Sequence, residues 1–178
     1  MKNIFILLLT TTFFSSTAQD WRFAKAETLE DYQTILKVSR EKEHLLFVAL
    51  HDGGGDFKRM FDAGVFENQN VLNSLSSFTA VAVDVRDEMG ARWMNLFPAD
   101  TIPSFYFLNG EEFLVNRAAG YITAQELQKL ATESHKNRNR YNELLEKYNN
   151  NSLSTKEWVE IIDLYSLNFP FAETSRLA

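Results

Sequence analysis

The side chains best suited to chemistry gather in one short stretch, from His51 to Asp56, directly after an apolar run. His51, Asp52 and Asp56 could hold a metal ion or exchange protons. However, a strand end followed by a glycine loop gives no fixed ligand spacing, and a hard metal ion would need further oxygen ligands. We therefore expect no metal site and no cofactor here. We interpret these side chains as solvated loop residues, with Asp56 capping the helix that follows.

Three consecutive glycines, Gly53, Gly54 and Gly55, stand between the apolar run and that helix. Glycine relaxes the limits on φ and bares backbone N–H groups, and the start of a helix favours anions. One interpretation is a nest for an anion or a carbonyl group. The other, which we favour, is a neutral and permissive loop. Neither of the glycine-rich nucleotide-binding motifs can be aligned with these residues.

A nucleophile is the remaining catalytic candidate, and Ser104 beside Pro103 is the residue to consider. Its one sequence-evident base is His51, and no orienting acid or oxyanion hole accompanies the pair, so a hydrolase is a weak hypothesis. The aromatic residues nearby alternate as in a strand, which favours core packing. The aromatic residues that we assign to packing are Phe105, Tyr106, Phe107, Trp93 and Trp158.

Composition narrows the function further. The chain has 178 residues, 45% of them hydrophobic, so it can bury a core of its own. Its formal net charge of -6 argues against nucleic acid as a partner. It contains no cysteine, which excludes thiol catalysis, thiolate metal sites and disulfide exchange.

The first 18 residues have the order of a secretory signal: Lys2, an apolar run over residues 4–9, and small residues ending at Ala18. We expect cleavage after Ala18 and a secreted or periplasmic protein. The apolar run is too short to span a bilayer comfortably, and threonines at 10–12 interrupt it, so an uncleaved anchor is the less favoured alternative. No transmembrane segment is expected after cleavage.

Hydrophobic periodicity predicts an alternation of strands and helices, which favours a mixed sheet between two layers of helices. Asn109-Gly110 predicts a tight hairpin turn with positive φ at both residues. Thr123, with Glu126 three residues later, predicts a helix start. The predicted helices are 28–40, 56–63, 68–75, 87–97 and 123–133, and the predicted strands are 45–50, 78–85, 101–108 and 112–117.

Beyond residue 134 the pattern becomes purely helical, with predicted helices at 141–148 and 154–167. Two such helices could be half of a helical repeat, but one pair cannot establish a repeat, and we favour a packing extension. The predicted organisation is therefore a signal peptide at 1–18, a main domain at 19–134 and a helical extension at 135–178.

Several local sequences, taken together, give the main domain a resemblance to a known family. Lys58-Arg59-Met60 follows the strand and glycine loop, Thr101-Ile102-Pro103-Ser104-Phe105 precedes another strand, and Gly120-Tyr121 closes the hairpin. With these features, residues 21–133 resemble the thioredoxin superfamily, especially its secreted bacterial members. The resemblance implies an α/β thioredoxin-like fold with a mixed sheet sandwiched by helices, and a cis-proline at Pro103.

The resemblance also shows what is missing. Aligned on Lys58-Arg59-Met60, the two cysteines of the family fall at Gly54 and Phe57, and the tryptophan before them falls at Gly53. Val48 falls where many thioredoxins bury a carboxylate that moves protons. The nucleophiles and their proton carrier are both replaced, so the resemblance implies that redox function has been lost.

The expected function is a redox-inactive binding or scaffolding module of the cell envelope or secreted space, which engages a protein or an extended peptide. In thioredoxin-like folds the loop before the second helix meets the cis-proline loop, and exposed backbone there can pair with a peptide. Phe57 is either an exposed anchor or a buried filler. The alternative is an enzyme with a non-thiol site at the His51–Asp56 loop. The expected partner-binding residues are Gly53, Gly54, Gly55, Asp56, Phe57, Ile102, Pro103 and Ser104.

Overall fold

The structure is a computed structural model that describes residues 23–175, with side chains described as far as Tyr165. The predicted signal peptide therefore lies outside the described residues. A single five-stranded sheet forms the centre, in the order β1-β3-β2-β4-β5. Strand β3 runs parallel to β1 and β2, whereas β4 runs antiparallel to β2 and β5. The strands are β1 (Ala24–Lys25), β2 (Leu45–His51), β3 (Phe78–Asp84), β4 (Ser104–Leu108) and β5 (Leu114–Ala119).

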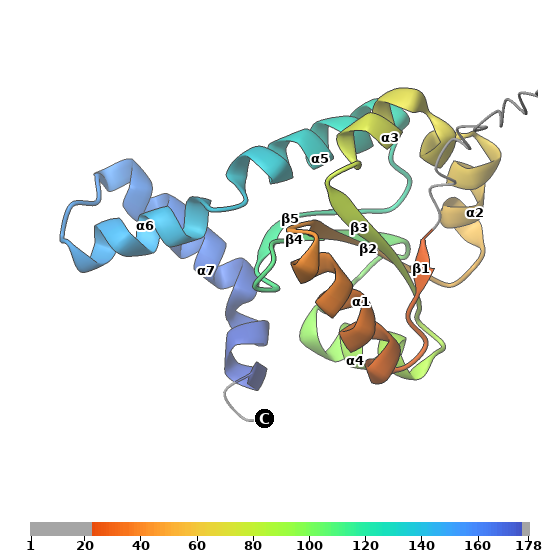
Figure 1. The fold of residues 1–178 in the computed structure, drawn as a ribbon, viewed down its shortest axis with the longest axis horizontal. Helices are drawn as coiled ribbons and strands as arrows, with labels where there is room; N and C mark the ends of the chain where they lie inside the picture. Colours follow the sequence, from red (N-terminus) through yellow and green to blue (C-terminus); the bar gives the residue numbers. More distant parts are fainter. Residues whose placement is uncertain (1–22, 176–178) are drawn as a thin grey trace, which may run out of the picture.

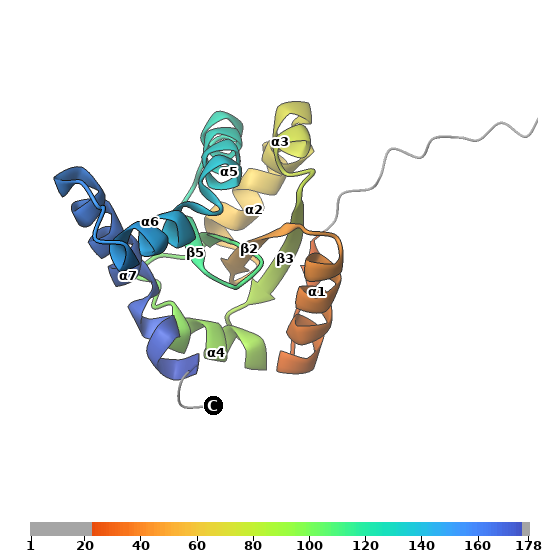
Figure 2. The same cartoon turned by 60° about the vertical axis from the view of Figure 1, so that its left-hand side comes forward.

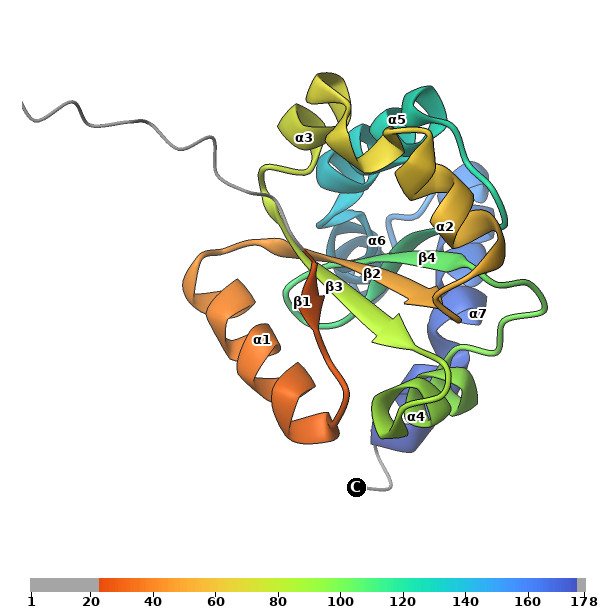
Figure 3. The ribbon, with the colours of Figure 1, turned by 90° about the vertical axis from the view of Figure 1, so that its right-hand side faces the viewer.

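Helices cover both faces of the sheet, as Figure 3 shows. One face carries α2 (Gly55–Asp62), the short 3-10 helix η1 (Val65–Glu67), α3 (Gln69–Ser74) and α5 (Ala124–Asn137). The other carries α1 (Leu29–Glu41) and α4 (Glu88–Leu96). The predicted elements between residues 28 and 133 are confirmed, most of them with ends within two residues; the predictions missed β1 and η1.

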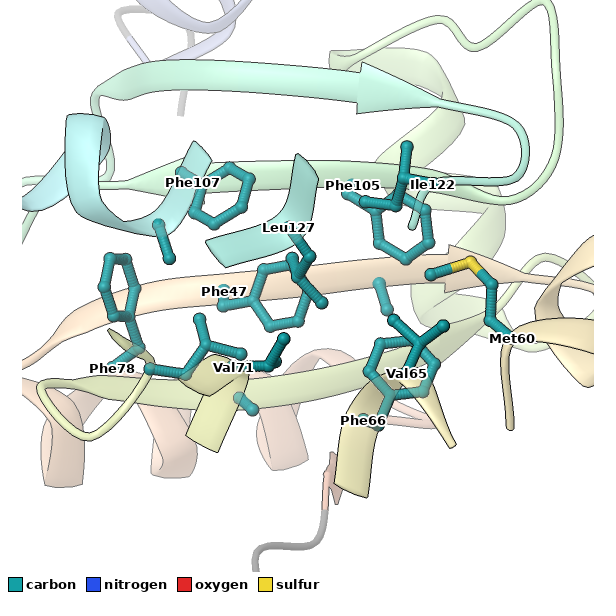
Figure 4. Close-up of a cluster of buried hydrophobic side chains, with 14 of the residues drawn as sticks. Phe47, Met60, Val65, Phe66, Val71, Phe78, Phe105, Phe107, Ile122 and Leu127 are labelled. Carbon is teal, nitrogen blue, oxygen red and sulfur yellow. The ribbon is translucent and has the colours of Figure 1, made fainter. Parts of the chain in front are cut away.

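Strand β2 supplies the middle of both hydrophobic cores, because alternate side chains point to opposite faces of a strand. Phe47 and Ala49 face α2, α3 and α5 (Figure 4). Leu46, Val48 and Leu50 face α1 and α4, where the ring of Trp93 is also buried. The uninterrupted apolar run thus forms a strand covered on both sides, as predicted.

Two helix starts position the chain around these cores. In α1 the Thr28 side chain accepts a hydrogen bond from the Asp31 N–H, and the Asp31 carboxylate accepts one from the Thr28 N–H. Thr123 and Glu126 make the same reciprocal pair at the start of α5. Each pair satisfies two backbone donors that a helix end would otherwise leave free. The helix start predicted at Thr123 is confirmed.

The turn between β4 and β5 corrects one prediction. Positive φ falls at Glu112 (62°), and neither Asn109 nor Gly110 adopts it. The Asn109 side chain is buried, and its oxygen accepts hydrogen bonds from the N–H groups of Glu111 and Phe113 at 3.0 and 2.9 Å. The asparagine therefore organises the connection through its side chain, so five residues, 109–113, replace the predicted tight turn.

A pair of helices, α6 (Arg140–Asn149) and α7 (Thr155–Ser175), follows α5 at the β5 end of the sheet (Figures 1 and 2). Helix α7 contacts β5 and α4, and the Phe113 and Tyr141 rings stack with centroids 4.2 Å apart. The predicted domain division at residue 134 falls inside α5 and remains a prediction. Among residues 23–175, no helix is both long enough and apolar enough to cross a membrane.

Candidate functional site

The two loops of the predicted site leave the same end of the sheet. Strands β2 and β4 are antiparallel, with Leu50 opposite Ser104. The glycine loop that follows β2 therefore starts beside the point where the loop that precedes β4 ends (Figure 3). This arrangement brings the two predicted segments, 53–57 and 102–104, into one region of the molecule.

The glycine loop uses its first two backbone donors internally. The Gly53 N–H donates to Nδ1 of His51, and the Gly54 N–H donates to Oδ1 of Asp52, each at 2.9 Å. Gly53 and Gly55 have φ of 76° and 50°, which explains why glycine is suited to both positions. The nest hypothesis required bare N–H groups and is therefore wrong for Gly53 and Gly54; the loop satisfies its own polar groups.

Asp56 does not have the role that the sequence predicts. Helix α2 begins one residue earlier than expected, and Gly54 is its N-cap residue without any side-chain cap. Asp56 consequently lies within the first turn, where its carboxylate pairs with Arg59 at 2.6 Å. A negative charge in a first turn still interacts favourably with the helix dipole, so Asp56 stabilises α2 without capping it.

Phe57 is buried, with 6% of its surface exposed, which decides between its two predicted roles. Its ring stacks on the His51 ring with centroids 4.2 Å apart and an interplanar angle of 2°. Three further phenylalanine rings, those of Phe23, Phe61 and Phe66, lie 5.2 to 6.2 Å away. Phe57 thus fills the inner face of α2, and the exposed-anchor alternative is wrong.

His51 has the geometry of a neutral structural histidine. Because Nδ1 accepts the Gly53 N–H, the proton of the neutral ring belongs on Nε2. Burial lowers the pKa of His51 from its usual 6.5, and the nearby carboxylates of Asp84 and Asp52 oppose that shift. Ser104 is also buried and donates its hydroxyl to the Thr101 carbonyl at 2.7 Å. Each group already has another partner, so the Ser104 and His51 pair gains no support as a hydrolase site.

The carboxylates near His51 are engaged as well. Asp84 forms a bidentate ion pair with Arg86, and these hydrogen bonds lower the pKa of Asp84 to about 2. Asp52 accepts the Gly54 N–H. In the part of the chain that the structure describes, no three histidine or acidic side chains are grouped so that they could hold a metal ion. The enzyme alternative at the His51–Asp56 loop is therefore not favoured.

The loop before β4 contains backbone groups that form no hydrogen bond within the described residues. The Ile102–Pro103 peptide bond is cis, Pro103 is buried, and its carbonyl accepts the Gly120 N–H at 2.7 Å. Ile102 is half-buried, and no other described residue bonds to its backbone N–H or carbonyl. These two groups of Ile102 are the open main-chain positions beside the glycine loop.

Sequence reasoning overlooked three residues that border this region. Phe61 and Tyr121 are large apolar side chains, 44% and 38% exposed. The Arg59 guanidinium lies 5.1 Å from the centre of the Tyr121 ring, which links α2 to the residue after Gly120. Phe61 lies one helical turn after Phe57, but spacing alone could not reveal which of the two rings is exposed.

Solved structures with a similar arrangement identify the fold. A candidate disulphide-isomerase from Bacteroides thetaiotaomicron superposes with a TM-score of 0.54 at 23% identity, covering 65% of this chain and 90% of that one. Thioredoxin NaTrxh from Nicotiana alata gives 0.51 at 19% identity, covering 69% and 98%. The fold is thioredoxin-like. No family model matches the sequence, and no curated protein matches it either.

In this chain the thioredoxin-like fold lacks the cysteines that carry out thiol-disulfide exchange. Identities below a quarter show the fold alone, so the activity in a neighbour's name is not transferred. Because the chain contains no cysteine, thiol-disulfide exchange has no nucleophile. At the two positions aligned with the cysteines of the family, the structure has the N-cap glycine of α2 and a buried phenylalanine ring.

Proposed function

We propose that this protein is a redox-inactive thioredoxin-like binding module that holds an extended peptide segment of a partner protein. The binding surface consists of the glycine loop and the backbone of Ile102, and the buried Pro103 and Ser104 lie beneath it. The observation that carries the proposal is the open N–H and carbonyl of Ile102 beside that loop. Strand pairing needs main-chain groups only, so it survives the loss of both cysteines.

Exposed side chains on α2 and directly after Gly120 suit such a partner. Phe61 and Tyr121 are exposed apolar side chains, and the Arg59 guanidinium, which is paired with Asp56, lies over the Tyr121 ring. Phe57, Pro103 and Ser104 are buried, so they support the surface from below and do not touch the peptide. We place the module in the periplasm or the secreted space, on the basis of the signal-like residues 1–18.

A peptide selection tests the proposal. Peptides are selected from a random displayed library on the purified protein, and the best binder is synthesised in three forms: unmodified, and with alternate amides N-methylated in either of the two registers. A paired strand directs every second N–H toward its neighbour. One methylated register should therefore lose binding at least about tenfold, while the other binds like the unmodified peptide.

Amide NMR shifts locate the peptide in the same experiment. We expect the largest shifts at Gly53, Gly54 and Ile102, and no insulin disulfide reduction above the control without protein. Failure to select any peptide would overturn the proposal. Equal binding of both methylated registers, or shifts confined to another surface, would overturn it as well.

A further inference from the structure

The outer side of the α6–α7 hairpin is a second surface, remote from the glycine loop. Its apolar side chains are about half exposed, in contrast with Leu144 and Ile161 on the inner side, which are buried. Figure 1 shows the hairpin at the far end of the molecule from α2 and β1. The exposed apolar residues are Leu145 and Tyr148 on α6, and Trp158, Val159, Ile162 and Tyr165 on α7.

Helical geometry makes these side chains one continuous face. Trp158, Ile162 and Tyr165 are spaced four and three residues apart, so they lie on one side of α7. The Tyr148 and Trp158 rings meet edge to face with centroids 5.4 Å apart, which joins the α6 and α7 parts of the patch. We call these six side chains the outer face.

Several charged residues of the hairpin form ion pairs with one another. Arg140 binds Glu160 at 2.7 Å and also reaches Glu157. Lys147 binds Glu157 from α6. These ion pairs tie α6 to α7 and neutralise the carboxylates of Glu157 and Glu160. A second apolar surface could therefore approach without leaving either of these acids unpaired.

The exposed apolar area of the outer face matches what a dimer interface would need from each subunit. Six side chains about half exposed present roughly 600 Å², if a large side chain has about 200 Å² in all. That is the upper end of what a soluble monomer usually exposes in one patch, about 300–600 Å². Two such faces in contact would bury roughly 1,200 Å², the lower limit of a stable protein interface.

From this match we infer that the protein forms a two-fold symmetric dimer through the outer face, with the α7 helices antiparallel and Ile162 near the axis. An isologous contact sets the same patch against itself, which suits a face that is apolar throughout. A membrane surface is the other apolar occupant to consider. Interfacial helices usually carry lysine and arginine on their polar face, whereas α7 carries one basic residue, Lys156, against the acids Glu157, Glu160 and Asp163 over its first three turns. The dimer does not depend on peptide binding.

Sedimentation equilibrium of the full protein tests the inference. Wild type should be a dimer at micromolar concentration, and Ile162→Glu should weaken dimerisation at least about 100-fold, because it brings two like charges together at the axis. Ile162 is 60% exposed, so the variant should fold with the circular dichroism spectrum of wild type, although loss of the dimer lowers its melting temperature. Val38→Glu is the matched control, since Val38 is an exposed aliphatic residue on α1, and it should remain dimeric.

Three outcomes would overturn the dimer. The first is a monomeric wild type up to about 100 μM, a weaker association than an interface of standard size gives. The second is an Ile162→Glu variant that dimerises as well as wild type. The third is a monomeric wild type that floats with phosphatidylcholine vesicles while Ile162→Glu does not, which would assign the outer face to membranes.

Discussion

The glycine loop and the outer face of the α6–α7 hairpin differ in what they leave exposed: the loop buries its large apolar ring, whereas the outer face exposes apolar side chains. At the loop, Gly53 and Gly54 donate to neighbouring side chains, and Phe57 is buried under His51. At the hairpin the charges are paired, whereas Trp158 and Ile162 remain exposed. The junction aligned with the redox site of thioredoxins is well packed, whereas the hairpin leaves a group of apolar side chains exposed among the described residues.

The largest expected effect concerns the packing of the loop. Phe57→Ala should lower the free energy of unfolding by about 3–5 kcal/mol, because it leaves a cavity between α2 and the sheet. Phe61→Ala removes the same ring from a position that is 44% exposed and should lower it by less than about 1.5 kcal/mol. Urea unfolding measures both values. Equal losses of unfolding free energy would contradict the assignment of Phe57 to the core and of Phe61 to the surface.

A smaller effect is expected at the ion pairs of the hairpin. Arg140→Ala leaves Glu160 without its partner and should destabilise the α6–α7 hairpin by roughly 1–3 kcal/mol, the usual range for a hydrogen bond to a charged group. Arg92→Ala breaks an exposed pair with Glu88 and should change stability by less than about 0.5 kcal/mol. Hydrogen exchange over residues 140–165 detects the difference. Unchanged protection in the Arg140 variant would mean that apolar contacts alone hold the hairpin.

The smallest effect is the pH dependence at His51. The pKa of His51 is lowered in the folded protein, so below its usual value of 6.5 the unfolded chain binds more protons. The contribution of the neutral ring is fully present above pH 6.5 and is lost as the pH falls toward the lower folded pKa. Between pH 7 and pH 5, wild type should therefore lose more stability than His51→Gln.

His44, whose pKa is also lowered by burial, titrates in both proteins and leaves a common residual slope. Identical slopes in the unfolding free energies of wild type and His51→Gln would contradict the neutral assignment of His51. The glycine loop would then not depend on a neutral His51 ring.

Sequence patterns predicted the fold well because strong local signals agreed with one another. The apolar run of β2 and the pairing of Thr123 with Glu126 each have a simple local cause. Local sequence could not decide whether Phe57 or Phe61 is exposed, because that depends on rings brought in from Phe23 and Phe66. The prediction of a tight turn at Asn109 and Gly110 was wrong because the Asn109 side chain bonds to the backbone N–H groups that such a turn would use differently.

The same limit applies to the site and to the hairpin. Sequence reasoning brought the two loops together through a family resemblance, but it could not foresee that His51 and Asp52 would occupy the glycine N–H groups. In α7, both Ile161 and Ile162 fit an amphipathic helix. Only the packing of α7 on its neighbours assigns Ile161 to the inner side and Ile162 to the outer face.

Trp93 and Trp158 have different surroundings, so their fluorescence can report on two different parts of the molecule. Trp93 is buried among aromatic rings, and no hydrogen bond reaches its indole nitrogen within the described residues, so it should emit at short wavelength. Trp158 is 45% exposed and should emit toward the red. With Trp21 replaced by phenylalanine, emission wavelength distinguishes two parts of the molecule: the red-shifted component reports on the hairpin, and the blue-shifted component reports on the helix α4 side of the sheet.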